Sequence, residues 1–175
     1  MCLLKHLKEW RHRRRERIYE GPCEDGGVRI SRDADAPKEI ESRTLVEFSC
    51  LVSLLSVMQE DTALPCGIYR FAAKRTEDGE GCILSYGRDL PKSEQYEKKL
   101  PLSFHDELEE LIRKYAVAQY NGQYYKVSGL PYFYGASLDA AYASGEAISC
   151  YNNQDPFLPI PMVEELCRLC GWEAL

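Results

Sequence analysis

The sequence has no apolar run long enough to cross a membrane. Its most apolar stretch, residues 51–57, is far shorter than the roughly 18–20 residues that span a bilayer. Near the N-terminus only Leu3, Leu4 and Leu7 precede a run of charges, whereas an export signal needs a longer apolar segment. We therefore expect a cytoplasmic protein without a membrane span.

Histidine is scarce, with three residues in the chain. His6 and His12 lie near the N-terminus, so His105 is the one histidine in the predicted domain. We expect it to be exposed in the first turn of a helix. Nucleophilic catalysis by a Ser–His or Cys–His pair needs a base that a third group positions. The sequence also lacks a phosphate-binding loop, a dinucleotide-binding fingerprint and an HExxH motif. No cofactor is expected, and catalytic activity is left open.

Eight cysteines are present, but only Cys167 and Cys170 form a C-x-x-C pair. Zinc would need two further ligands at matching spacing, so no metal site is expected. The pair also closes a predicted helix, where the helix dipole disfavours a thiolate. We expect reduced cysteines that are mostly buried as small hydrophobic residues.

Positive charge is concentrated at the N-terminus of an acidic chain. Residues 1–20 contain seven Lys or Arg and three Glu, a charge of +4, which leaves −10 for the remainder of a chain whose net charge is −6. We predict a basic helical arm over residues 1–20 and a linker over 21–43. The arm could bind nucleic acid, because arginines neutralise phosphates and a tryptophan stacks on bases, through Trp10, Arg11, Arg13, Arg14, Arg15 and Arg17. Alternatively it lies on an anionic membrane surface or is a solvated extension.

The remaining residues, 44–175, are predicted to form a single α+β domain. Alternating or short apolar segments indicate strands at residues 45–57, 66–76, 81–86, 123–127, 136–143 and 147–151, although a helix also fits the first of them. Helical periodicity predicts helices over residues 104–118, with Ser103 as the N-cap, and over 161–170. We expect a mostly antiparallel sheet of about five to six strands with two packed helices.

An aromatic loop between two predicted strands is the candidate binding site within the domain. Tyr132 and Tyr134 lie in a short segment bounded by glycines, and hydroxyl, amide and carboxylate groups follow the last strand at Tyr151, Asn152, Asn153 and Asp155. Rigid rings beside adaptable polar groups suit recognition of a sugar, a peptide or a base. Alternatively the rings pack into the core and the amides satisfy the backbone of turns.

The segment YYKVSGLPYFYGASLDAAYASGEAISCYNNQDPFLP, residues 124–159, resembles uncharacterised proteins of Gram-positive gut bacteria. This resemblance implies a bacterial, single-domain protein and brings no activity or site residues. The sequence therefore favours a binding or interaction module whose partner is a protein or a small polar ligand. Two alternatives stay open: a nucleic-acid-associated protein that uses the arm, and a hydrolase that acts through the Tyr/Asn/Asp cluster.

Overall fold

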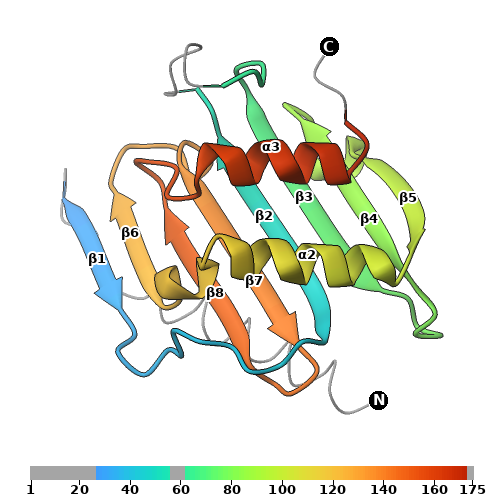
Figure 1. Cartoon of the computed structure of the whole chain (residues 1–175). Helices are drawn as coiled ribbons and strands as arrows, with labels where there is room; N and C mark the ends of the chain where they lie inside the picture. Colours follow the sequence, from blue (N-terminus) through green and yellow to red (C-terminus); the bar gives the residue numbers. More distant parts are fainter. Residues whose placement is uncertain (1–26, 56–61, 173–175) are drawn as a thin grey trace.

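Eight strands form one mixed sheet in the computed structural model, which describes residues 27–55 and 62–172 (Figure 1). The strands are β1 (Val28–Arg32), β2 (Leu45–Ser53), β3 (Ile68–Arg75), β4 (Gly81–Arg88), β5 (Tyr96–Pro101), β6 (Gln123–Val127), β7 (Ala136–Tyr142) and β8 (Ala147–Asn152). Their order across the sheet is β1-β6-β8-β7-β2-β3-β4-β5. Only β6 and β8 are paired in parallel, and every other neighbouring pair in this sheet is antiparallel.

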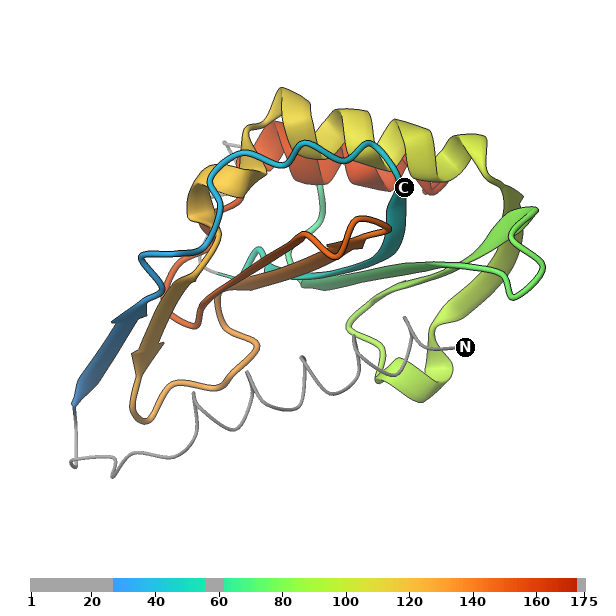
Figure 2. The same cartoon turned by 90° about the horizontal axis from the view of Figure 1, so that it is seen from below.

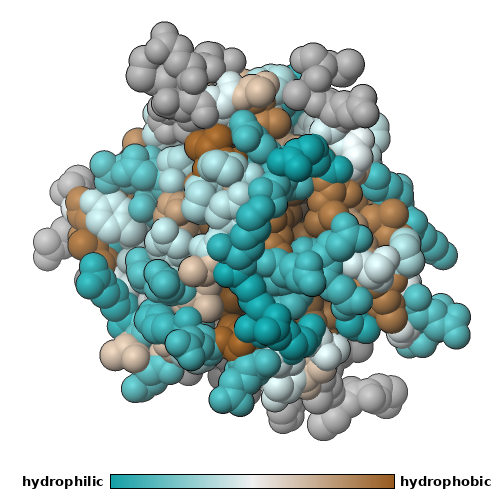
Figure 3. All heavy atoms as spheres, in the orientation of Figure 1, coloured by the Kyte–Doolittle hydropathy of each residue, from teal (hydrophilic) through white to brown (hydrophobic). Residues whose placement is uncertain are grey.

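Two helices cover one face of this sheet. Both α2 (Ser103–Lys114) and α3 (Ile160–Leu169) lie across the strands on the same side (Figure 2). The opposite face has no α-helix of the described residues on it and is called the uncovered face below. Short 3₁₀ helices, η2 (Lys92–Glu94) and η3 (Val117–Tyr120), follow β4 and α2. Hydrophilic residues cover much of the helix-bearing face, with hydrophobic patches between them (Figure 3).

Strand alternation places the core between the sheet and the helices. In β2, Phe48, Cys50 and Val52 are buried beneath the helices, while Ser49 and Leu51 point to the other face. A register shift between Leu45 and Glu47 interrupts this alternation. Such an irregularity inserts an extra residue, which is why Leu45 is buried instead of Val46.

The structure has the expected α+β class and the two expected helices. Each of the six predicted strands is present, but the described sheet has eight strands, so the expected number of five to six is wrong. The two additional strands are β1, within the expected linker over residues 21–43, and β5, within a charged segment. Both are edge strands, and neither has a row of buried apolar side chains, since Val28 and Ile30 are exposed and Tyr96 is exposed. The expected helical arm lies outside the described residues.

Helix α2 differs from its expected boundaries at both ends. It begins after Leu102, which occupies the N-cap position without a side-chain hydrogen bond, so Ser103 is not the cap. It ends at Lys114, because Ala116 adopts a left-handed conformation (φ 49°) before the chain continues as η3. The expected helix over residues 104–118 is therefore two shorter elements.

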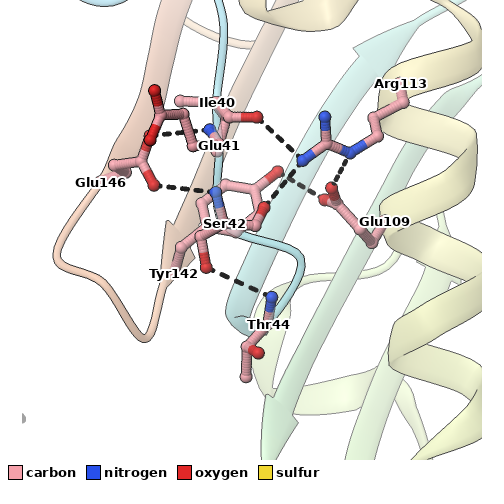
Figure 4. A network of polar contacts seen from close by, with 8 residues as sticks. All are labelled: Ile40, Glu41, Ser42, Thr44, Glu109, Arg113, Tyr142 and Glu146. Carbon is pink, nitrogen blue, oxygen red and sulfur yellow. Dashed lines mark hydrogen bonds and ion pairs between the residues drawn. The ribbon is translucent and has the colours of Figure 1, made fainter.

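A buried polar network joins α2 to the segment that precedes β2 (Figure 4). Glu109 accepts a hydrogen bond from the Tyr142 hydroxyl at 2.7 Å and pairs with Arg113 one turn further along α2. The Arg113 guanidinium also donates to the carbonyl oxygens of Ile40 and Ser42, each at 2.8 Å. Burial, and then the bond to Glu109, raise the pKa of Tyr142, so its proton stays on the hydroxyl. These bonds fix residues 40–42 against α2 and β7.

His105 is fully buried between α2 and the sheet, so the expectation that it is exposed is wrong. Because α2 begins at Ser103, His105 lies on the same inner face as Glu109 and Ile112. Its Nδ1 atom lies 3.0 Å from the Leu45 carbonyl oxygen and therefore carries the proton, while Nε2 has no hydrogen-bond partner among the described residues. Burial lowers the pKa of His105 below its ordinary value of 6.5.

We expect His105 to make the stability of the protein depend on pH. With its pKa lowered in the folded state, the unfolded chain takes up this proton first, so the stabilisation is fully present above the unfolded pKa of 6.5 and is lost as pH falls below it. His105→Asn keeps a donor near the Leu45 carbonyl and cannot titrate. Urea unfolding of both proteins at several pH values between about 5 and 8 should show a smaller loss of unfolding free energy in the variant at low pH. An equal loss in both would contradict this origin.

Candidate functional site: a polar cavity on the uncovered face

A cavity of about 690 Å³ lies on the face of the sheet opposite the helices. Its lining comes from β2, β3, β6, β7 and β8, from Tyr132 in the loop between β6 and β7, and from Pro91 and Gln95 beside η2. Figure 2 shows this loop (orange) and η2 (yellow-green) on the uncovered side of the sheet, at opposite ends of it. The cavity therefore lies over the middle strands, between two segments that project from the sheet.

Two serines, an alanine and a leucine form the floor of the cavity. Ser49 on β2 lies opposite Ala72 on β3, and Ser137 on β7 lies opposite Leu51 on β2. Because directly opposed residues of paired strands point to the same face, these four side chains form a shallow centre with longer side chains around it. The volume is within the range of roughly 300–1,000 Å³ that is typical of small-molecule sites.

A carboxylate and two hydroxyl groups form a hydrogen-bonded chain in this face. The Ser149 hydroxyl donates to Asp139 Oδ1 at 2.7 Å, and its oxygen lies 3.4 Å from the Tyr124 hydroxyl. Since the Ser149 proton is directed to Asp139, the Tyr124 hydroxyl is the donor to Ser149. Asp139 is an acceptor-only group when ionised, so it suits a ligand that donates hydroxyl or amide protons.

Aromatic rings form one end of the cavity. The rings of Tyr124 and Tyr151 lie 5.8 Å apart between centroids and are tilted by 30°. The Tyr151 hydroxyl donates to the Tyr132 carbonyl oxygen at 3.4 Å, which connects β8 to the β6–β7 loop. Tyr132 itself is 64% exposed, and its ring contacts that of Phe133 edge to face. Aromatic rings are the side chains on which flat ligands commonly stack.

A guanidinium group lies at the other end. Tyr151, Ser137, Leu51 and Arg70 are opposed in turn across β8, β7, β2 and β3. Three strand spacings of nearly 5 Å separate the first from the last, or about 15 Å. The Arg70 guanidinium is partly oriented by the Leu90 carbonyl oxygen, at 3.4 Å. A single row across the sheet thus runs from an aromatic ring to a guanidinium group.

The residues predicted from the sequence have different places in this structure. Tyr132 and Tyr151 line the cavity, whereas Tyr134, Asn153 and Asp155 are not part of its lining. Asn152 lies beside a smaller cavity of about 190 Å³, and its side-chain oxygen accepts backbone hydrogen bonds at residues 154 and 155. The predicted residues of the arm, Trp10 and the five arginines between positions 11 and 17, lie outside the described residues.

Sequence reasoning missed Arg70, Asp139, Ser149 and Tyr124. Arg70, Asp139 and Ser149 are polar residues at alternate positions of strands whose intervening residues are apolar, whereas Tyr124 lies between Gln123 and Tyr125 and has no such signal. The same alternation that identified the strands also marked a polar face of the sheet. The strand order that brings the four residues together was not available from the sequence, because β6 lies next to β8 and not β7.

Asn153 holds the aromatic loop in place. Its side chain accepts a hydrogen bond from the Val127 amide at 2.7 Å and donates to the carbonyl oxygens of Val127 and Leu130, at 3.0 and 3.2 Å. Gly135, at the other end of the loop, lies so close to β8 that an added Cβ would meet the Asn152 carbonyl oxygen at 2.1 Å. The position of Tyr132 therefore depends on a buried asparagine and on a glycine without space for a side chain.

The described cysteines do not supply a nucleophile to the cavity. All six are free, and Cys66 is exposed while the other five are buried. Burial, followed by the charge of Asp139, raises the pKa of the Cys150 thiol well above its ordinary value, and burial raises those of Cys167 and Cys170 to about 12. The prediction that Cys167 and Cys170 are core residues is confirmed. Within residues 27–55 and 62–172, no group of three or more His, Cys, Asp or Glu side chains is placed to hold a metal ion.

Comparison of the chain with protein-family models, with curated proteins and with solved structures finds no match. None of the helices in the described part of the chain is long and apolar enough to cross a membrane.

We expect Asn153→Ala to destabilise the protein by about 1–3 kcal/mol, because it removes three hydrogen bonds from the fully buried Asn153 side chain to partly buried backbone groups of Val127 and Leu130. Tyr132→Ala is the matched control in the same loop and should change the unfolding free energy by less than about 0.5 kcal/mol, since its ring is mostly exposed. Thermal and urea unfolding of both variants measure this difference. A loss in Tyr132→Ala as large as that in Asn153→Ala would place the Tyr132 ring in the core.

Proposed function

We propose that the chain is a small cytoplasmic bacterial binding module, and that its ligand is a neutral, hydroxyl-rich molecule of the carbohydrate class. The ligand occupies the cavity on the uncovered face of the sheet. The observation that carries this proposal is the row from Tyr151 through Ser137 and Leu51 to Arg70, with Asp139 beside it. Rings, hydroxyl groups, an acceptor and a donor are thus all present in one cavity.

The composition of the lining favours a sugar over the peptide and the base that the aromatic loop also suits. Sugar rings present apolar C–H faces to aromatic side chains and hydroxyl groups at their rims, and the cavity offers both kinds of partner. Asp139 accepts hydroxyl protons, and Arg70 donates to hydroxyl oxygens. The lining contains one carboxylate, Asp139, beside two cations, Arg70 and Lys126, and charges of both signs suit a neutral ligand better than a polyanion, whose phosphate groups Asp139 repels.

The two alternative functions receive less support from the described residues. A nucleic-acid-associated function rests on the basic arm, which lies outside them, so its support is the sequence alone. A hydrolase acting through the Tyr/Asn/Asp cluster would need free polar groups, but the side chains of Asn152 and Asn153 bond to backbone atoms. His105, the one described histidine, lies beneath the sheet on the face opposite the cavity. A cytoplasmic location fits the free thiols of the described cysteines.

Binding of a panel of soluble mono- and oligosaccharides by the full chain tests the proposal. Ligand-detected NMR identifies the sugars that bind, and isothermal titration calorimetry measures their affinity. For a sugar that binds, Arg70→Ala and Asp139→Asn should each weaken the affinity about tenfold, because each removes a charged hydrogen-bonding group from the cavity. Asp139→Asn keeps an acceptor for Ser149, so the fold should be preserved.

Lys74→Ala is the matched control for Arg70→Ala. Lys74 lies on β3 four residues from Arg70, so it points to the same face, but it is exposed and not part of the cavity lining. Its removal should leave the affinity unchanged. The proposal fails if no sugar of the panel binds, or if Lys74→Ala weakens binding as much as Arg70→Ala does.

A further inference from the structure

The two edges of the sheet differ in how they are protected against pairing with another strand. Strand β5, at one edge, contains Glu97, Lys98 and Lys99 and ends at Pro101, all of which discourage the addition of a further strand. Strand β1, at the other edge, has no proline and no acidic residue. Its apolar residues Val28 and Ile30 are 53% and 60% exposed. The β1 edge therefore has the features of a pairing edge.

The hydrogen bonds of β1 show which of its backbone groups are directed away from the sheet. Ser128 N–H donates to the Gly27 carbonyl at 3.0 Å, and Asp33 N–H donates to the Gly122 carbonyl at 2.9 Å. In an antiparallel pair, residues bonded to the partner strand alternate with residues directed away from it. Odd-numbered residues of β1 thus bond to β6, and the N–H and C=O groups of Val28, Ile30 and Arg32 point outward. No strand of the described residues pairs with these outward groups.

We infer that this edge binds the same edge of a second copy of the chain, with β1 antiparallel to its counterpart and Ile30 on the two-fold axis. In this register Ile30 lies opposite Ile30 of the second copy, and Val28 lies opposite Arg32. All of these residues have outward backbone groups, so each opposed pair exchanges two hydrogen bonds, six in total by the antiparallel pattern. A two-fold interface uses the same surface on both copies, which this register satisfies.

Side-chain chemistry selects this register over its neighbours. With Ile30 on the axis, Arg29 lies opposite Ser31, and no two like charges are directly opposed. A shift that centres Arg29 instead would place two guanidinium groups directly opposite each other, which is unfavourable. A shift that centres Ser31 would leave Val28 opposite Ala34, beyond the end of β1, and so lose hydrogen bonds. The five residues are self-complementary in one register only.

Pairing would cover apolar surface and extend the cavity-bearing face. Val28, Ile30 and Arg32 share the helix-side face of the sheet, so the Ile30 side chains meet and the Arg32 stem covers Val28. Arg29 and Ser31 are opposed to Lys126 and Tyr124 of β6, and therefore point to the same face as the cavity. The uncovered faces of the two copies become continuous across the new pair.

Sedimentation velocity of the full chain over a wide concentration range tests this inference. We expect a concentration-dependent species of twice the 20.1 kDa monomer mass. Ile30→Lys puts two ammonium groups opposite each other on the axis and removes the apolar pair, and should raise the dimer dissociation constant about tenfold or more. Tyr96→Lys makes the same kind of change at an exposed residue of the β5 edge and should have no effect.

A cross-link provides independent evidence for the register. Under mild oxidation Ile30→Cys should form a covalent dimer, since residues opposed as a hydrogen-bonded pair have Cα atoms about 5.5 Å apart, within reach of a disulfide. Tyr96→Cys should not do so beyond the background of the wild-type protein. A wild-type protein that stays monomeric at every concentration overturns the inference. A dimer that persists in Ile30→Lys, or is lost in Tyr96→Lys, also overturns it.

Discussion

The structure depends on the packing of α2 and α3, the two α-helices of the described residues, on the same face of an eight-stranded sheet. Because strand side chains alternate between the two faces, each strand must supply apolar residues to the helices and is free to present polar ones on the other side. In β2 this separates Phe48, Cys50 and Val52 from Ser49 and Leu51. The core and the polar cavity are therefore built from the same strands. Alternate residues of each strand point to the core, and the residues between them point to the cavity.

Two buried asparagines hold the backbone beside the cavity in position through their side-chain hydrogen bonds. Asn121 donates to the carbonyl oxygens of Pro37 and Ala147 and accepts from the Ser149 amide, all within 2.9 Å. These bonds fix the backbone of β8 at Ser149, whose hydroxyl donates to Asp139. Asn153 does the same for the loop that carries Tyr132. Both asparagines are fully buried, and their side chains hold backbone groups that position residues of the cavity.

The sequence was sufficient to predict the elements with a strong apolar pattern. The central strands and both helices have a buried face, so periodicity identifies them. An example is the inward set of α3 and its C-cap residue, which comprises Val163, Leu166, Cys167 and Cys170. Strands β1 and β5 were missed because an edge strand with exposed residues has no such pattern. His105 was misplaced because its polarity suggested exposure, whereas its position in the first turn of α2 directs it to the sheet.

The candidate site was predictable only where it depends on local sequence. The aromatic loop and Tyr151 stand out by composition, and both contribute to the cavity. Arg70 and Asp139 lie on strands that are far apart in sequence, and only the order β7-β2-β3 brings them to one surface. No local pattern contains this order, because it follows from long-range pairing. Asn152 and Asn153 have the composition of a binding site but the role of turn and loop anchors.

Mapping the amides perturbed by a bound saccharide in a ¹H–¹⁵N correlation spectrum tests the central claim most directly. The account predicts that the shifts concentrate on the strands and loop that line the cavity, at Ser49, Leu51, Arg70, Tyr132, Ser137, Asp139 and Tyr151. The outer surfaces of α2 and α3 should be unchanged, because the core separates them from the cavity. Shifts centred on the two helices, with none on β2, β3, β7 and β8, would contradict it.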